Sequence, residues 1–198
     1  MKQFKIGKMV VKPLTPELWP DYEDLFGPRG AYGGCWCMYW RTTRKEFELG
    51  QGEINRCLFK KIVDSGEITG LLGYIDNQAV SWCSVAPREK FTSLDRSRVL
   101  KRIDDRDVWS IVCFFIRKGC RKRGLMLAMI QAAIEYVSSR QGRIIEAYPS
   151  VVRSPKAPPV TIFMGTPEIF RMAGFIDVAR PSRSKLFMRY HIGQGRGK

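Results

Sequence analysis

The residues that could do chemistry most directly are the cations and glycines of one short loop. The sequence RKGCRKRG occupies residues 117–124 and follows Val108–Ile116, a run of β-branched and aromatic residues that predicts a strand. A long amphipathic helix is predicted directly after the loop, because apolar residues recur at helical spacing: Leu125, Ala128, Met129, Ala132, Ala133, Tyr136 and Val137. The N-terminus of a helix presents unpartnered N–H groups and the positive end of the helix dipole. The pattern therefore predicts an anion site, most simply for a phosphate or diphosphate.

The spacing of the two glycines separates this loop from the common phosphate motifs. Gly119 and Gly124 have the separation found in a P-loop, but Leu125 stands where that motif needs a lysine. A dinucleotide-binding fold would require G-x-G-x-x-G after the strand, and this pattern is absent. Neither motif explains the loop.

What remains, RKRGLM at Arg121–Met126, resembles the R-x-x-G-x-G/A loop of the GNAT superfamily of N-acetyltransferases. Ile116 stands at the β-branched position five residues before the arginine, and Met126 replaces the last small residue of the motif. The resemblance implies that the coenzyme A diphosphate is bound by the loop and the first turn of the helix, at Arg121, Lys122, Arg123, Gly124, Leu125 and Met126. It also implies that the strand end lines the pantetheine and gives a backbone N–H to the thioester carbonyl, at Phe114, Phe115 and Ile116.

The resemblance extends to the fold. Phe170–Phe175 and the strand-like stretches after it are similar to the family's closing helix, G-F turn and terminal hairpin, and residues 70–74 and 79–85 read as a hairpin around Asp76-Asn77. We expect an α/β (α+β) fold: a single domain over residues 1–192, with a mixed, mainly antiparallel central sheet, helices on both faces and a parallel strand pair at the coenzyme site. Residues 193–198 are expected to be a disordered basic tail.

Acetyl transfer needs a polarised carbonyl and a neutral amine, and an acid can assist the leaving thiolate. The strand at residues 109–116 carries no carboxylate, so Glu146 in the following strand is the candidate base, with a solvent-facing or ion-paired glutamate as the alternative interpretation. The resemblance places the acid at Phe170, which has no hydroxyl. Tyr148 is the candidate substitute and Tyr190 a second, unless the thiolate leaves unaided. Three further carboxylates precede the strand and could act as a base through water: Asp104, Asp105 and Asp107.

The N-terminal half is expected to build the acceptor side. Trp36, Tyr39 and Trp40 follow paired glycines, and they are predicted either to line the acceptor pocket or to be core or cover residues. A helix is predicted over Glu53–Val63, with its core face formed by Ile54, Cys57, Leu58, Lys61 and Ile62. Prolines in residues 149–164 predict a lid-like loop beside the active site, with an irregular surface loop as the alternative.

Composition narrows the classes of function. The net charge of +15 favours an anionic partner, and it has three explanations: solubility, an acidic substrate, or association with nucleic acid or the ribosome, for which no motif is present. Six scattered cysteines indicate reduced thiols and a cytoplasmic protein. One histidine, His191, and no paired C-x-x-C spacing argue against a metal site. No apolar run is long enough to span a membrane, and the oligomeric state stays open.

Together these features predict an acetyl-CoA-dependent N-acetyltransferase. Acetyl-CoA is the co-substrate, and the acceptor is a primary amine on a small molecule or peptide. Two alternatives of a different class remain: a module that binds acyl-CoA without catalysis, and a basic RNA- or ribosome-associated protein.

Overall fold

The computed structural model describes residues 3–152 and 158–193 of the 198-residue chain. The strands are β1 (Phe4–Ile6), β2 (Met9–Pro13), β3 (Leu71–Ile75), β4 (Gln78–Pro87), β5 (Trp109–Ile116), β6 (Ile144–Ala147), β7 (Ile176–Ser182) and β8 (Lys185–His191). The α-helices are α1 (Trp19–Phe26), α2 (Arg44–Leu49), α3 (Glu53–Asp64), α4 (Thr92–Arg96), α5 (Leu125–Ser139) and α6 (Pro167–Met172). The expected tail lies, from residue 194 onward, outside the described residues.

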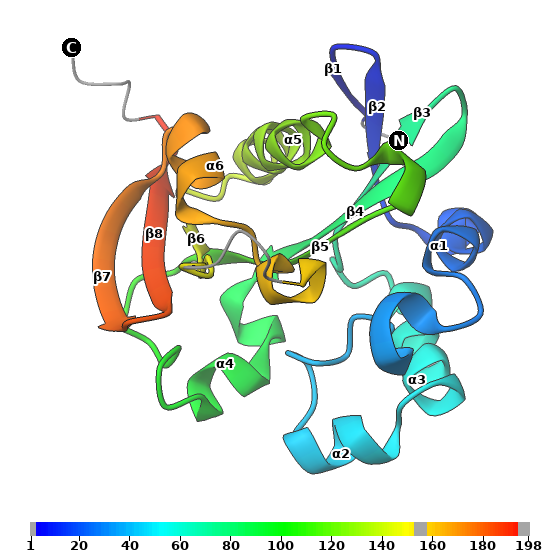
Figure 1. Cartoon of the computed structure of the whole chain (residues 1–198), viewed down its shortest axis with the longest axis horizontal. Coiled ribbons are helices and arrows are strands. Elements are labelled where there is room, and N and C mark those ends of the chain that lie inside the picture. Colours follow the sequence, from blue (N-terminus) through cyan, green and yellow to red (C-terminus); the bar gives the residue numbers. More distant parts are fainter. Residues whose placement is uncertain (1–2, 153–157, 194–198) are drawn as a thin grey trace.

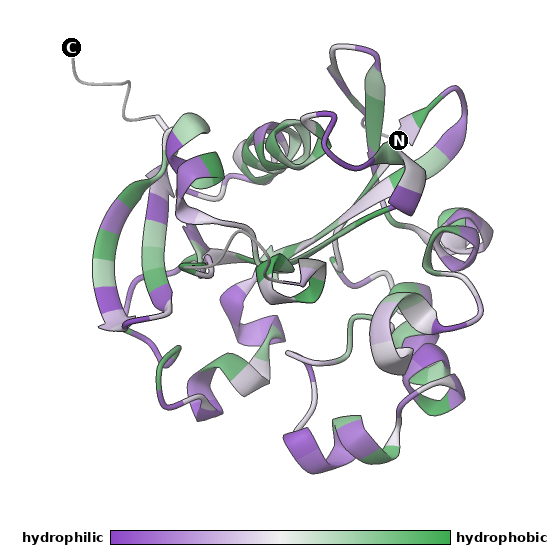
Figure 2. Cartoon of the chain, viewed as in Figure 1, coloured by the Kyte–Doolittle hydropathy of each residue, from purple (hydrophilic) through white to green (hydrophobic). Residues whose placement is uncertain are grey.

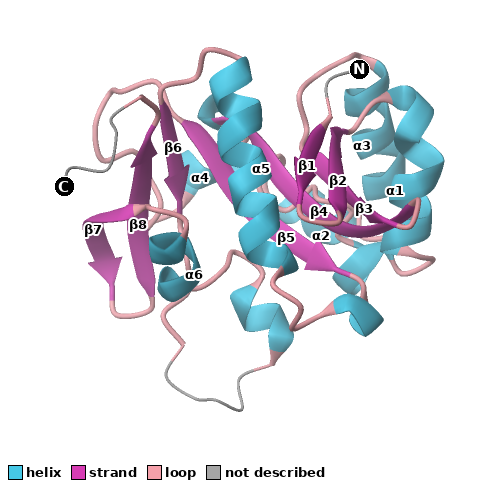
Figure 3. Cartoon of the chain, turned by 90° about the horizontal axis from the view of Figure 1, so that it is seen from above, coloured by secondary structure: helices cyan, strands magenta, loops and turns pink. Residues whose placement is uncertain are grey.

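The strands form one mixed sheet in the order β1-β2-β3-β4-β5-β6-β8-β7. Every neighbouring pair is antiparallel except β5 and β6, which are parallel and joined by α5 as the crossover helix. The predicted fold class, including its parallel pair, is confirmed. Figure 3 shows α5 lying across the sheet, with the β7–β8 hairpin at one end and the β1–β2 hairpin toward the other.

Local sequence signals explain several elements. Asp76 and Asn77 have φ of 49° and 62°, and this left-handed pair closes the β3–β4 hairpin where it was predicted. The helix α5 begins at Leu125 directly after Gly124 and ends at Ser139, as its apolar stripe indicates. In Figure 2 this helix is largely hydrophobic, whereas the basic loop before it is largely hydrophilic.

The helices cover both faces of the sheet (Figure 1). One face packs against α5 and α6 through a core that includes Met129, Ala133 and Phe170. The other face carries α1, α2 and α3 over an aromatic cluster, and α4 over a third cluster that contains Leu94, Leu100 and Phe187. Within the described residues, no helix has the length and apolar character needed to cross a membrane.

One local prediction is corrected. Helix α3 buries Asn55, Phe59 and Val63, not the predicted stripe, and Ile54 is 58% exposed. The large ring of Phe59 packs in the aromatic cluster, and this orientation of α3 turns the face that was predicted to be buried toward solvent. Pro20 lies in the first turn of α1, where a missing N–H costs nothing.

Candidate active site

The site is built where β5 and β6 diverge. The two strands pair only over three residues of each, from Trp109 opposite Ile145 to Ile111 opposite Ala147. The next residue, Val112, is an extra residue in the pairing of β5 with β4, because Ser84 lies opposite Cys113 and Val85 opposite Ile111. Such a bulge bends and twists its strand. Beyond it, β5 runs on to Ile116 without β6 beside it, so the pair has a closed end and an open end.

The closed end is fixed by a buried polar network around Glu146. Its carboxylate accepts hydrogen bonds from Arg88 Nη1 at 3.1 Å and from Arg189 Nε at 2.7 Å. Glu146 and Arg88 are each 1% exposed, and Arg88 also donates to Asp95 at 2.7 Å. Because isolated charges are costly in a core, each charge here requires the others. Glu146, the predicted base, therefore lies inside a structural ion-pair cluster.

Tyr148 belongs to the same network. Its hydroxyl donates to Glu146 Oε1 at 2.8 Å and lies 2.7 Å from Ser110 Oγ on β5. Full burial raises the pKa of Tyr148 well above its ordinary value. At the rim of the network, hydrogen bonds from Arg189 hold the pKa of Asp104 down at about 2. The structure thus brings the two predicted catalytic residues together, and it saturates both with partners.

The open end directs the backbone N–H of Phe114 into the gap beside β5. Arg117 N–H bonds to Val80 O, and because N–H groups alternate along an antiparallel pair, the N–H of Phe114 points away from β4. It donates to the carbonyl oxygen of Phe163 at 2.7 Å. Two residues after Phe163, the carbonyl oxygen of Gly165 accepts a hydrogen bond from the N–H of Ser150, which follows β6, at 3.0 Å. Residues 163–165 therefore bridge the gap between the diverging strands.

The conformation of this bridging segment (Phe163, Met164 and Gly165) is specific. Gly165 has φ of +81°, and a Cβ there would lie 2.7 Å from the ring of Phe170, so glycine is required. Met164 is fully buried, while the half-buried ring of Phe163 meets the Tyr39 ring edge-on at 6.3 Å between centroids. The segment follows the short 3-10 turn at Pro159–Ile162, in the stretch that was predicted to be a loop beside the active site.

The basic loop lies at the N-terminus of α5. Gly124 has φ of +75°, and a Cβ at this position would meet nothing within 4 Å, so the space beside the helix start is open. No side chain caps the helix and its first turn carries no acid, which leaves the first N–H groups directed outward. Arg121, Lys122 and Arg123 are exposed beside it, and Arg121 Nε donates to Ile116 O at 3.0 Å. The arrangement fits an anion such as a diphosphate.

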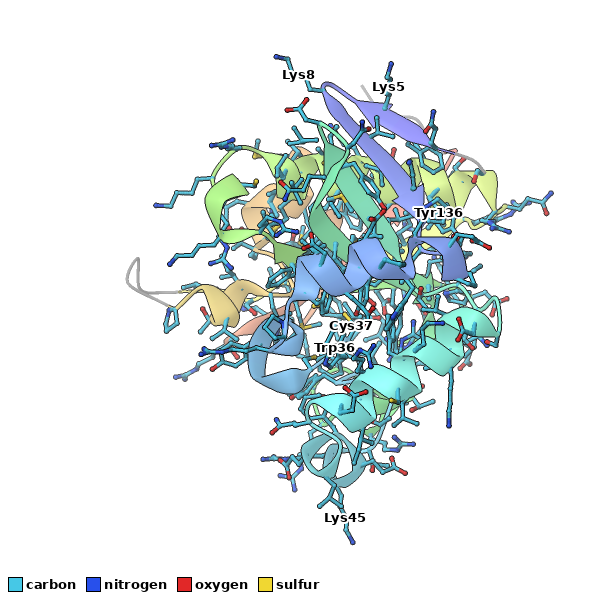
Figure 4. All side chains as sticks on the ribbon, turned by 90° about the vertical axis from the view of Figure 1, so that its right-hand side faces the viewer. Lys5, Lys8, Trp36, Cys37, Lys45 and Tyr136 are labelled. Carbon is cyan, nitrogen blue, oxygen red and sulfur yellow. The ribbon has the colours of Figure 1, made fainter. Side chains whose placement is uncertain are left out.

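The predicted aromatic trio is divided by the structure. Trp36 is buried in the aromatic cluster, stacked on Trp19 and Phe26, and Figure 4 places it inside the molecule beside Cys37. Tyr39 is 46% exposed and packs edge-on against Trp40, which is half-buried. Tyr39 reaches Phe163 and Trp36 does not, so only the second half of the trio borders the open end.

Other predicted residues take simpler places. Phe114 and Leu125 face the α5 core, and Phe115 packs against the aromatic cluster through Phe26. Phe170, at the family's acid position, is fully buried against Phe114 and Phe175. All six cysteines are free thiols.

Sequence reasoning missed three residues that shape the site: Arg88, Phe163 and Lys185. The burial of Arg88 depends on its carboxylate partners, and these lie 58 residues away for Glu146 and 7 for Asp95. No local pattern around Arg88 therefore predicts it. Phe163 acts through its carbonyl, which every residue has. Lys185 begins β8 and has no motif around it; the residues that bury it come from β6 onward.

Comparisons with known proteins agree with this geometry. The Acetyltransferase (GNAT) family model matches residues 15–154. No curated protein matches the sequence significantly. The described residues contain no group of three or more His, Cys, Asp or Glu side chains that could hold a metal ion.

Several solved structures share the fold. The ribosomal-protein-S5-alanine acetyltransferase of Vibrio fischeri is 9% identical with a TM-score of 0.56, covering 98% of this chain and 98% of that one. A GNAT-family acetyltransferase of Streptococcus agalactiae is 14% identical with a TM-score of 0.56, covering 96% and 98%. The PaiA N-acetyltransferase of Thermoplasma acidophilum in complex with coenzyme A is 12% identical with a TM-score of 0.52, covering 92% and 98%.

Proposed function

The chain belongs to the GNAT family of acetyltransferases, and from this premise we propose that it transfers the acetyl group of acetyl-CoA to a primary amine at the open end of β5 and β6. The observation that carries the proposal is the pairing of two N–H sites. One is the uncapped, cation-flanked start of α5, and the other is the Phe114 N–H directed into the gap between the strands. A solved relative of the same fold, the PaiA N-acetyltransferase, contains coenzyme A.

The diphosphate of the donor is assigned to the basic loop. The N–H groups of Leu125 and Met126 face a space that Gly124 leaves open, and the dipole of α5 favours negative charge there. The exposed side chains of Lys122 and Arg123 supply positive charge, whereas Arg121 donates a hydrogen bond to the end of β5. Met126 replaces a small residue of the family motif, but its side chain is half-buried against the α5 core and leaves the backbone free.

The thioester carbonyl is assigned to the Phe114 N–H. A donor aimed at the carbonyl oxygen stabilises the negative charge that develops during attack. Phe163 supports this assignment, because its own carbonyl oxygen already accepts from that N–H at 2.7 Å. A carbonyl therefore fits at the position, and acetyl-CoA binding requires the bridging segment to withdraw.

The amine is assigned to the α4 side of the sheet, between the bridging segment and the exposed ring of Tyr39, with Trp40 behind it. We propose that Glu146 and Tyr148 position the strands and do not exchange protons with substrate, because each is saturated by buried partners. The acceptor then binds as a neutral amine, and the thiolate leaves without an acid, which its modest basicity permits.

One specific observation favours a second candidate, an acyl-CoA-binding module without catalysis. Glu146 and Tyr148 are enclosed by guanidinium and hydroxyl partners, and Phe170 has no proton to give. A protein of this kind would bind the coenzyme as described and release no thiol.

Calorimetric titration with acetyl-CoA, followed by thiol release across small amines, peptides and aminoglycosides, tests the proposal. Binding with amine-dependent thiol release supports the acetyltransferase, and binding without any release supports the module. Absence of binding contradicts both. RNA retention that weakens as salt rises would instead favour the RNA-associated alternative.

A further inference from the structure

Lys185 lies on the acceptor side of the sheet. It is the first residue of β8, and side chains alternate along this strand: Leu186 and Met188 face the α5 core, whereas Phe187 packs in the cluster that carries α4. Lys185 therefore shares the face of Phe187, opposite the basic loop at the start of α5. An acyl donor bound at that loop would reach the open end from one face, and Lys185 meets it from the other.

The ammonium of Lys185 contacts only neutral groups. Its Nζ donates to Ser150 Oγ at 2.9 Å, to the backbone oxygen of Tyr148 at 3.3 Å and to Met164 Sδ at 3.2 Å. It also lies over the ring of Phe163, 5.9 Å from the centroid.

No carboxylate among the described residues forms an ion pair with it, and the sequence outside residues 3–152 and 158–193 contains no Asp or Glu. Burial without a counter-ion lowers the pKa of Lys185 to about 8, so about half of this amine is neutral at that pH, where an ordinary lysine is almost fully charged.

The position of this amine relative to the acyl site follows from the bridging segment. The carbonyl oxygen of Phe163 accepts a hydrogen bond from the Phe114 N–H, at the position assigned to the thioester carbonyl. Met164, whose sulfur touches Nζ, is the next residue, and the Phe163 ring lies beneath Nζ. Both of these residues, which contact Nζ, thus belong to the segment that occupies the carbonyl position, and withdrawal of Phe163 and Met164 removes both contacts from the amine.

We propose that Lys185 is an acetyl acceptor within the chain, so that the protein acetylates itself at this residue. The inference rests on the proposed function, because it requires acetyl-CoA at the open end. The lone pair of the neutral Nζ attacks the thioester carbonyl carbon. A C–N bond forms, the C–S bond breaks, and its electron pair leaves on the coenzyme A sulfur. The proton lost by Nζ neutralises that thiolate, and the products are Nζ-acetyl-Lys185 and free coenzyme A.

Acetylation removes the charge of a poorly solvated ammonium, so the modified side chain suits its surroundings better than the original. The reaction is limited to one event per chain. In the absence of any external amine, the protein is therefore expected to release one equivalent of thiol and then stop.

The test is incubation of the full chain with acetyl-CoA alone, followed by intact-mass measurement and peptide mapping. The expected result is one acetyl group per chain, on Lys185, with a rate that saturates as acetyl-CoA increases. Lys185→Arg keeps a cation but offers no acceptor of this kind, and it should abolish the mark. Lys101→Arg, at an exposed site, is the matched control and should leave it unchanged. Circular dichroism checks that both variants are folded.

Two results overturn the inference and separate it from the proposed function. An unmodified Lys185, in a protein that binds acetyl-CoA and acetylates added amines, refutes self-acetylation and leaves the proposed function standing. Acetyl groups spread equally over exposed lysines, with a rate that never saturates, refute it as well. Failure of acetyl-CoA to bind in calorimetry refutes the proposed function and the inference together.

Discussion

The two ends of the β5–β6 pair are built on opposite principles. At the closed end, Ser110 lies opposite Glu146, and buried side chains from β5, β6, β8 and the turn after β4 complete one another's hydrogen bonds. At the open end, the strands share no hydrogen bond, and a separate piece of chain, Phe163–Gly165, holds one bond to each side. The first arrangement fixes the angle between the strands, while the second can be exchanged for another carbonyl-bearing group.

The difference teaches where polar burial serves structure and where it serves binding. Removing Glu146 leaves Arg88 and Arg189 without the carboxylate that they share, which makes the network costly to open. The Phe114 N–H needs only a carbonyl oxygen, and a ligand can provide one as well as Phe163 does. The closed end and the open end are separated along β5 by the single bulged residue Val112.

The largest expected effect comes from breaking the closed end. Glu146→Ala leaves Arg88 and Arg189 facing each other without their shared carboxylate, and we expect the unfolding free energy to fall by about 3–5 kcal/mol. Urea denaturation measures this. Glu168→Ala, at an exposed position on α6, is the control and should change it by less than about 0.5 kcal/mol. Unchanged stability together with loss of an acid limb in the pH–rate profile would restore Glu146 as the base.

The next effect concerns the anion site at the open end. Arg121→Glu places a carboxylate beside the proposed diphosphate site, and we expect affinity for acetyl-CoA to fall by about 100-fold, measured by calorimetry. Arg140→Glu changes the net charge equally at the opposite end of the same helix, so its affinity should stay within about twofold of the original. Equal losses in both variants would mean that net charge, and not the loop, attracts the coenzyme.

A smaller effect is expected from loosening the bridging segment. Phe163→Ala removes the ring contacts with Tyr39 and Lys185, each worth about 0.5–1 kcal/mol, so acetyl-CoA should displace the segment more easily. We predict a dissociation constant lower by up to about tenfold. Val160→Ala, in the turn before the segment, should leave the constant unchanged. Weaker binding by Phe163→Ala would show that the ring holds the coenzyme and does not exclude it.

The last effect, which develops only at alkaline pH, is the pH dependence that Lys185 adds to stability. Its pKa falls from the ordinary lysine value of 10.5 to about 8 on folding, so between these pH values the unfolded chain binds a proton that the folded chain lacks. Folding stability contributed by this group therefore rises as pH increases from about 8 to 10.5. Urea denaturation across this pH range should show that the unfolding free energy of the original protein increases relative to that of Lys185→Met. A difference that does not change with pH would mean that the ammonium is fully solvated.

Much of the fold was predictable because its signals are local. The apolar stripe from Leu125 to Val137 and the Asp76-Asn77 turn each fix an element without reference to the rest of the chain. The prediction for α3 failed for the converse reason. The apolar residues of α3 are spread almost evenly around the helix, so their spacing does not define one buried face. Phe59 is buried because its ring packs against the rings of Trp19 and Tyr22.

The site was predictable only on the donor side. Residues 121–126 lie next to one another in sequence and keep their motif, so the basic loop could be located directly. The roles of Glu146 and Phe163 depend on partners distant in sequence, since Arg189 is 43 residues from Glu146 and Phe163 lies 49 residues beyond Phe114. The periodicity of apolar residues along the sequence does not predict contacts between residues so far apart. The assigned catalytic and binding residues stay predictions until they are tested by substitution.

Hydrogen exchange of the full chain, with and without saturating acetyl-CoA, tests the central claim most directly. Coenzyme binding should slow exchange at residues 122–128, at the start of α5. It should speed exchange at Ser150 and across residues 158–165, because the bond from Ser150 N–H to Gly165 O is broken when the segment withdraws. Residues 144–147 at the closed end should not change. Unchanged or slower exchange at Ser150 and residues 158–165, in a protein that binds the coenzyme, would contradict the account.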